Sequence, residues 1–360
     1  MNKKIPAFNF SVLFIYPIIS LFSGIGVYDV VRYSGVDSYI SIFFSFIFVM
    51  FFIVVFLTIY NFKEDFNLKR KISYLFGNFL GGIINLILTL LFTIIGASLL
   101  FNVSNFFINY FLPNTPIIIF MLLLFIVVIY NVYHGISNVC RVGIIFMYII
   151  FIFTFIGILG LINYIDLNNF KPFLEYGLIK PFNGGLILTF INIIPIFSLL
   201  MVKKSDISDH NKLKRYIFLF ISIGILIEFI TLFLTIGALG INLTNFFQYP
   251  DYVVLKKISF FSFIERIENI FYIKWLFSSV MFLSLIVNYI SKSYSCNSKL
   301  IFPSFIFIIF ILFSLIFLKN TSYFYYFILK VLPFTNLFIF IIFFVIFLNI
   351  IIRKFLIKEK

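Results

Sequence analysis

Ten stretches of about 20 mostly apolar residues, joined by short connectors, constrain this chain more than any other feature of its sequence. Each stretch is long enough to cross the hydrocarbon core of a bilayer as a helix. Helices are required there because lipid offers no hydrogen-bond partners to exposed backbone groups. The predicted spans are residues 8–29, 38–61, 78–101, 114–134, 142–164, 183–202, 216–239, 269–291, 300–318 and 331–352.

The composition supports the same fold class. Hydrophobic residues make up 63% of the 360 residues and charged residues only 11%. A soluble domain is about 45–50% apolar and about 25% charged, so a chain of this length lacks the polar side chains to cover itself in water. The connectors are also too short for a separate soluble domain. We therefore predict an all-α integral membrane protein with a single transmembrane domain, residues 1–360.

The placement of the basic residues predicts the orientation of the bundle. Connectors on the cytoplasmic side of a membrane are enriched in Lys and Arg. If the N-terminus lies inside, 18 of the 27 Lys and Arg residues fall on the inside and eight on the outside. Both termini are therefore expected in the cytoplasm of a bacterial cell. The net charge of +14 then reflects topology and attraction to anionic lipid headgroups, and we expect no nucleic-acid partner.

The sequence carries no recognisable catalytic or metal-binding motif. It has no G-x-x-x-x-G-K-[ST] phosphate loop, no H-E-x-x-H zinc motif and no G-x-S-x-G nucleophile motif. Cys140 and Cys296 are too few and too far apart for a metal motif, and on the cytoplasmic side they are expected to remain free thiols. We therefore predict that the protein is not an enzyme and has no cofactor or metal.

Two predicted spans contain residues that interrupt an α-helix. Span 1 carries Ser23, Gly24 and Gly26, and span 6 carries Asn192 and Pro195. Glycine tolerates backbone angles outside the helical range, and proline removes a backbone donor. Non-helical backbone at membrane depth is tolerated only where it is buried in protein or lines a wet cavity. These five residues are therefore candidates for a ligand site.

The two interrupted spans occupy equivalent places if the chain consists of two halves of five spans, about residues 8–164 and 183–352. Such paired interruptions indicate an inverted-repeat transporter fold with a substrate site near the middle of the membrane. Broken helices present positive N-terminal ends, which favour an anionic group such as an amino acid carboxylate. The alternative is that the glycines allow close helix packing and Pro195 only kinks its helix.

Three charged residues fall within or beside the spans. Glu228 lies near the centre of span 7, where an ionised carboxylate needs a partner or water. It is either a contact for a proton or a ligand amine, or a neutral structural carboxyl. Lys274 is close enough to the outer end of span 8 to extend its side chain to water. Asp29, at the exit of span 1, is expected at the membrane interface rather than at a ligand.

From about residue 8 to residue 350 the chain resembles one known family, the nutrient-germination permeases, which form the B subunit of bacterial spore germinant receptors, and four sequence blocks carry the resemblance. Phe111–Pro116 resembles the motif LLPxTP, and Phe173–Pro181 resembles LENGIKP. The remaining matches are Tyr133–Ile136 with Arg141, for Y…GIE…AR, and Tyr249-Pro250 with Ile258–Glu268, for YP…ISIGDFLERLD, followed by Trp275. This family is distantly related to the amino acid/polyamine/organocation transporters.

The resemblance implies a receptor subunit in the spore inner membrane that senses small nutrients, typically amino acids. Its implied partners are an A-type membrane subunit and a C-type lipoprotein. Members commonly carry Pro-Phe-Gly-Glu in span 6, where this chain has Asn192–Pro195, so no role of that glutamate is carried over. Glu228 is a candidate substitute. The alternatives are a proton- or sodium-coupled amino acid transporter, or a structural subunit that no longer binds a ligand.

Overall fold

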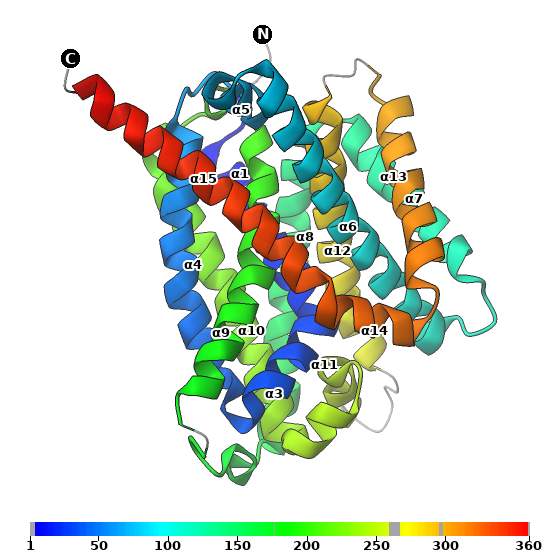
Figure 1. Cartoon of the computed structure of the whole chain (residues 1–360). Helices are drawn as coiled ribbons and strands as arrows, with labels where there is room; N and C mark the ends of the chain where they lie inside the picture. Colours follow the sequence, from blue (N-terminus) through cyan, green and yellow to red (C-terminus); the bar gives the residue numbers. More distant parts are fainter. Residues whose placement is uncertain (1–3, 176, 259–266, 295–297, 359–360) are drawn as a thin grey trace.

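The chain folds into a bundle of α-helices (Figure 1), and the computed structural model describes residues 4–175, 177–258, 267–294 and 298–358. Within these residues one isolated β-bridge joins Ile5 to Ile207, and there is no strand. The helices are α1 (Ala7–Val12), α2 (Ile15–Leu21), α3 (Val27–Ser34), α4 (Ser38–Asn61), α5 (Leu68–Phe76), α6 (Asn78–Phe111), α7 (Ile117–Tyr133), α8 (Ile136–Leu161), α9 (Ile179–Ile193), α10 (His210–Phe246), α11 (Pro250–Val253), α12 (Ile267–Ser293), α13 (Ile301–Phe313), α14 (Thr321–Lys330) and α15 (Leu332–Lys358).

Nine helices of the described part of the chain are long and apolar enough to cross a membrane. A further apolar helix, α7, is shorter, with 17 residues. Helix α6 runs past the predicted end of its span, from 101 to Phe111, whereas α10 leaves the helical conformation at Gly240 (φ 74°, ψ 165°), one residue after the predicted end of span 7, before it continues to Phe246. The hydropathy falls at the end of α6 because Asn102 and Asn105 are polar, but both are buried against other helices and the helix continues.

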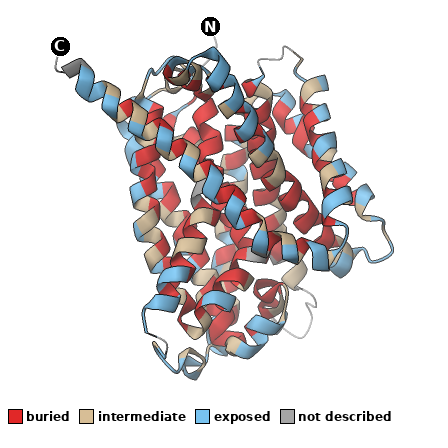
Figure 2. Ribbon diagram, viewed as in Figure 1, coloured by how far each residue is buried: buried red, intermediate tan, exposed pale blue. Residues whose placement is uncertain are grey.

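The bundle shows the polarity expected of a lipid-exposed protein. Figure 2 shows exposed positions on the outward faces of the helices and buried positions on the inward faces. Helix α4 is a clear case, because it buries Ser41 and Ser45 completely while Phe43 is 63% exposed. In water this arrangement would be reversed, whereas in a bilayer the small polar residues form the contacts between helices.

Span 6 packs closely against span 2. Helix α9 lies against α4 at Gly184 and Gly185. A Cβ atom added to Gly185 would lie 2.9 Å from the carbonyl oxygen of Ser41, so only glycine permits this approach. Thr189, one turn later, donates a hydrogen bond of 2.7 Å to the carbonyl oxygen of Gly185, and its hydroxyl oxygen lies 3.4 Å from Ser45 Oγ. The N-terminal half of α9 is therefore held against α4 by close backbone contact.

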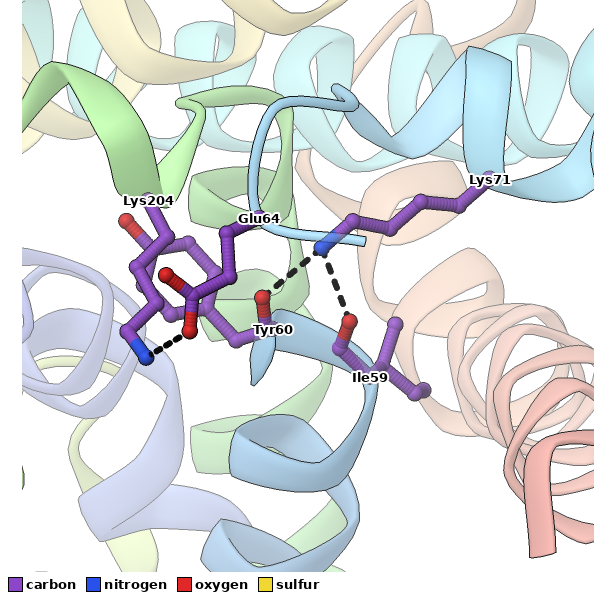
Figure 3. A network of polar contacts seen from close by, with 5 residues as sticks. All are labelled: Ile59, Tyr60, Glu64, Lys71 and Lys204. Atoms are coloured by element: carbon purple, nitrogen blue, oxygen red, sulfur yellow. Dashed lines mark hydrogen bonds and ion pairs between the residues drawn. The ribbon is translucent and has the colours of Figure 1, made fainter. Parts of the chain in front are cut away.

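Four segments of the chain meet at one end of the bundle, and the sequence predicted each of them to lie on the inside of the membrane. The β-bridge joins the N-terminal segment to the connector after span 6. Lys204, in that connector, forms an ion pair with Glu64, which follows span 2 (Figure 3). Arg353 of α15 donates a hydrogen bond of 2.8 Å to the carbonyl oxygen of Leu75. The two ends of the described chain lie at this same end of the bundle (Figure 1).

Lys71 has a structural role that its sequence position did not predict. It is one of the 18 Lys and Arg residues predicted to lie inside, where basic charge is attracted to lipid headgroups, but Lys71 is only 1% exposed. Its ammonium donates hydrogen bonds of 2.8 Å to the carbonyl oxygens of Ile59 and Tyr60, at the end of α4 (Figure 3). Burial lowers the pKa of Lys71 to about 7. The lysine therefore caps a helix C-terminus.

Cys140, one of the two predicted free thiols, is buried and is a free cysteine in the structure. Cys296 lies outside the described residues.

Candidate functional site

The backbone of span 1 leaves the helical conformation between α2 and α3. In the segment Phe22–Gly26 (η1), Ser23 has ψ of 128° and Gly24 has φ of 86°. A positive φ of this size strains any residue with a Cβ atom, which explains glycine at position 24. A Cβ there would also lie 2.7 Å from Cζ2 of Trp275. Gly24 is therefore required both by its backbone angle and by the ring packed on it.

Side chains from three other parts of the chain converge on this segment. The indole Nε1 of Trp275 donates a hydrogen bond of 2.9 Å to the carbonyl oxygen of Ser20. In a regular helix that carbonyl would accept from the N–H of residue 24, so the tryptophan caps the end of α2. Asn102 of α6 also lies against Gly24, and the hydroxyl of Tyr249 donates to its Oδ1 at 3.0 Å. Sequence reasoning did not assign these residues to the site, although Tyr249 and Trp275 belong to a recognised motif.

A buried carboxylate completes this group. Asp251, in α11, accepts a hydrogen bond of 3.1 Å from the hydroxyl of Tyr272, and its other oxygen has no partner within the described residues. Burial raises the pKa of Asp251 from its ordinary value of 3.8 to about 6. The Lys274 ammonium and the Tyr272 hydroxyl oppose this rise, and α11 contacts the η1 segment. Asp251 therefore lies beside the break in span 1.

The raised pKa of Asp251 predicts a specific pH dependence of stability. The Asp251 carboxyl binds its proton more tightly in the folded protein than in the unfolded chain. Its contribution to the stability of the fold is therefore complete below about pH 4 and is lost as the pH rises through about 6. Asp251→Asn removes the cost of the buried charge. We expect the variant to be more stable than the parent by about 3 kcal/mol at pH 8, with no difference near pH 4.

Thermal unfolding of both proteins in detergent, measured across this pH range, tests the prediction. Asp166→Asn is the control, because Asp166 is an exposed aspartate. A constant difference between Asp251→Asn and the parent at every pH would show that the carboxyl does not titrate in this way.

A second polar contact joins spans 6 and 7. The amide Nδ2 of Asn192, near the end of α9, donates a hydrogen bond of 2.8 Å to Oε2 of Glu228 on α10. Glu228 is only 1% exposed. The remaining oxygens, Asn192 Oδ1 and Glu228 Oε1, have no partner within the described part of the chain. Two of the six predicted site residues thus form a buried pair with unused hydrogen-bonding capacity.

The other predicted site residues occupy these two regions. Ser23 and Gly26 belong to η1, and a Cβ at Gly26 would lie 2.7 Å from the Phe22 ring. Pro195 follows the end of α9 at Ile193, in a 3₁₀ segment that runs from Ile194 to Met201. The η1 segment contacts both α9 and α11, so the break in span 1 lies between the helix that carries Asn192 and the one that carries Asp251.

Two charged residues differ from expectation. Asp29, predicted to be interfacial, is buried, with 5% of its surface exposed. Lys274, predicted to extend to water, is partly buried and lies where its charge acts on Asp251. Part of the recognised motif block, Ser259–Arg266, and Tyr176 in another block lie outside the described residues.

These features define a multi-pass, permease-like membrane protein. The family model described as "Spore germination protein" matches residues 10–325, and the chain therefore belongs to this spore germination protein family. This is a family of permease-like germination proteins rather than of enzymes. Spore germination protein XB of Bacillus anthracis is 24% identical over 261 residues, which cover 72% of this chain and 72% of that protein.

Proposed function

We propose that this chain is the permease-like subunit of a spore germinant receptor, and that it binds a small nutrient, such as an amino acid, and thereby triggers germination. The observation that carries the proposal is the non-helical backbone at Ser23 and Gly24, in a member of a germination family. Broken backbone inside a membrane requires protein or ligand partners, and it presents free N–H groups to a carboxylate.

The proposed site consists of Ser23, Gly24 and Gly26 on span 1, Asn192 and Pro195 on span 6, and Glu228 on span 7. The unpartnered oxygens of Asn192 and Glu228 suit the ammonium group of an amino acid, because ammonium groups only donate hydrogen bonds. The breaks in spans 1 and 6 suit its carboxylate. In this proposal the two halves of the chain, about residues 8–164 and 183–352, form an inverted repeat around the site.

Nutrient binding would act by shifting the bundle between two conformations. A ligand moves such an equilibrium only by its difference in affinity for the two states. An A-type membrane subunit and a C-type lipoprotein are the proposed partners that detect the change. Both termini are proposed to lie in the cytoplasm, as the excess of Lys and Arg at that end favours.

The role of Glu228 is tested by Glu228→Gln. This change keeps an acceptor for the Asn192 amide but removes the ionisable proton. We expect the nutrient response to lose its pH dependence over about pH 5 to 8 and to weaken about tenfold in nutrient sensitivity. The assay is nutrient-triggered germination of spores that carry the variant in place of the parent gene. An unaltered pH profile and sensitivity would make Glu228 a structural residue.

A proton-coupled amino acid transporter is the second candidate, favoured by the same buried Glu228 carboxyl. The two functions are separated by reconstituting the purified protein in liposomes and imposing a proton gradient. Accumulation of amino acid that depends on the gradient indicates transport. Nutrient binding without accumulation, together with loss of germination in a deletion strain, supports the receptor.

A further inference from the structure

A cavity lies between the outer part of span 1, span 6 and the last two helices. Its volume is about 140 Å³, and its walls come from α3, α9, α14 and α15. Most of its lining is apolar, from Ile187, Phe190, Ile191, Ile328, Leu332 and Pro333. Tyr33 and Pro333 in the lining are exposed, so the cavity reaches the surface of the bundle. None of the six residues proposed for the nutrient site lines it.

Two polar side chains line the cavity, and both have an unused acceptor. Asp29 Oδ1 and Asn336 Oδ1 are buried and have no hydrogen-bond partner among the described residues. A buried carboxylate without a partner is costly. Arg32, one turn after Asp29, is exposed and donates to the hydroxyl of Tyr28 at 3.2 Å, so its charge attracts Asp29 through space and supplies no hydrogen bond to Asp29 Oδ1. The cavity therefore offers two acceptor oxygens in an apolar enclosure.

From this lining we propose that the cavity is a binding site for a small ligand with a primary ammonium group and a short apolar body. An ammonium group supplies the N–H donors that both oxygens lack, and its charge, like that of Arg32, attracts the Asp29 carboxylate. The apolar walls suit a hydrocarbon chain, and an enclosure of about 150 Å³ holds a molecule the size of benzene. Alkali and alkaline-earth ions fit less well, because they require a shell of several oxygen ligands.

The position of the cavity gives the ligand access from outside. Asp29 lies five residues before the end of α3, which corresponds to about 8 Å along a helix. Because α3 and α9 line both this cavity and the flanks of the span 1 break, a ligand here would bias how these two helices pack. The proposal concerns binding alone and does not depend on the receptor function.

The test uses the purified full chain in lipid nanodiscs, with n-propylammonium chloride as the probe. Binding is measured by calorimetry and by the shift in unfolding temperature. We expect n-propylammonium to bind the parent protein at least about tenfold more tightly than n-propanol or tetramethylammonium, which lack the charge or the N–H donors. If n-propanol binds as tightly as n-propylammonium, the cavity is only an apolar void. If sodium chloride has the same effect as n-propylammonium chloride, the cavity is an alkali-ion site. Either result overturns the proposal.

Three variants locate the binding. Asp29→Asn should weaken n-propylammonium by at least about tenfold, and Ile187→Trp, which fills the cavity but keeps the carboxylate, should do the same. Asp37→Asn is the matched control: Asp37 is also buried near the end of span 1, but it accepts a hydrogen bond from the N–H of Leu174 and does not line the cavity. Unchanged binding by a folded Asp29→Asn or Ile187→Trp protein would overturn the proposal.

The assay separates this proposal from the receptor function. If n-propylammonium does not bind to a protein that still supports germination, the proposed cavity site is overturned and the receptor function is not. Normal, Asp29-dependent binding in a protein that does not support germination would support this site and remove only the receptor function.

Discussion

Gly24→Leu is expected to reduce nutrient-triggered germination to the level of a deletion strain, while the protein still inserts into the membrane. Gly24 has φ of 86°, a conformation that costs a residue with a Cβ atom about 1–2 kcal/mol. The added Cβ would also lie 2.7 Å from the buried ring of Trp275. That ring cannot simply turn away, because its Nε1 is bonded to the carbonyl oxygen of Ser20. The break in span 1, and with it the proposed carboxylate site, must therefore rearrange.

The measurement is the loss of absorbance of spores after addition of nutrient, with the amount of protein in the membrane fraction checked by immunoblot. Gly82→Leu is the matched control, because Gly82 lies on a membrane helix with no atom near its added Cβ. A normal response from a well-expressed Gly24→Leu protein would remove the break in span 1 from the proposed site.

Gly185→Leu is expected to prevent stable folding. Its added Cβ would lie 2.9 Å from the carbonyl oxygen of Ser41 and 3.2 Å from the backbone nitrogen of Ser45. Backbone atoms cannot move aside as a flexible side chain can, so α9 and α4 must separate along their contact. Overpacking at a buried contact costs about 1–3 kcal/mol even where side chains can adjust. We expect a loss of at least about 3 kcal/mol here, with little monodisperse protein after extraction in detergent.

Size-exclusion profiles and unfolding temperatures of Gly185→Leu, Gly82→Leu and the parent protein test this second expectation. Gly82→Leu adds the same side chain to a glycine with open space around it, so it controls for the added hydrophobicity. An unfolding temperature for Gly185→Leu equal to that of Gly82→Leu would show that α4 and α9 are not packed as closely as described.

The fold class followed from the sequence alone, and the reason is physical. Transfer of apolar side chains into lipid is favourable residue by residue, so a window of about 20 positions identifies a span without knowledge of its neighbours. The same additivity explains the errors at helix ends: α6 continues past residue 101 because Asn102 and Asn105 are buried between helices, which hydropathy cannot register.

The family could also be recognised from the sequence, because the motif blocks between residues 111 and 275 include turns and polar residues. Such residues are less interchangeable than the apolar residues that face lipid. The sequence marked Gly24 as a candidate helix interruption, with close helix packing as the alternative, and in the structure its φ is 86°. A positive φ is a local backbone requirement that glycine meets without strain, so the residue type itself points to it. The structure added the reason that no side chain replaces it, which is the indole ring of a residue about 250 positions later.

Which polar groups meet was decided only by the tertiary structure. In helix α4 the spacing of Ser38, Ser41 and Ser45 places them on one face, but hydropathy alone does not say whether that face turns to lipid or to the interior. Likewise, nothing in the sequence pairs Asn192 with Glu228 or brings Asp29 and Asn336 to one cavity. Lipid solvates any apolar face equally well, so hydropathy determines that a helix is in the membrane, and the packing of helices against one another determines which of its residues face the interior.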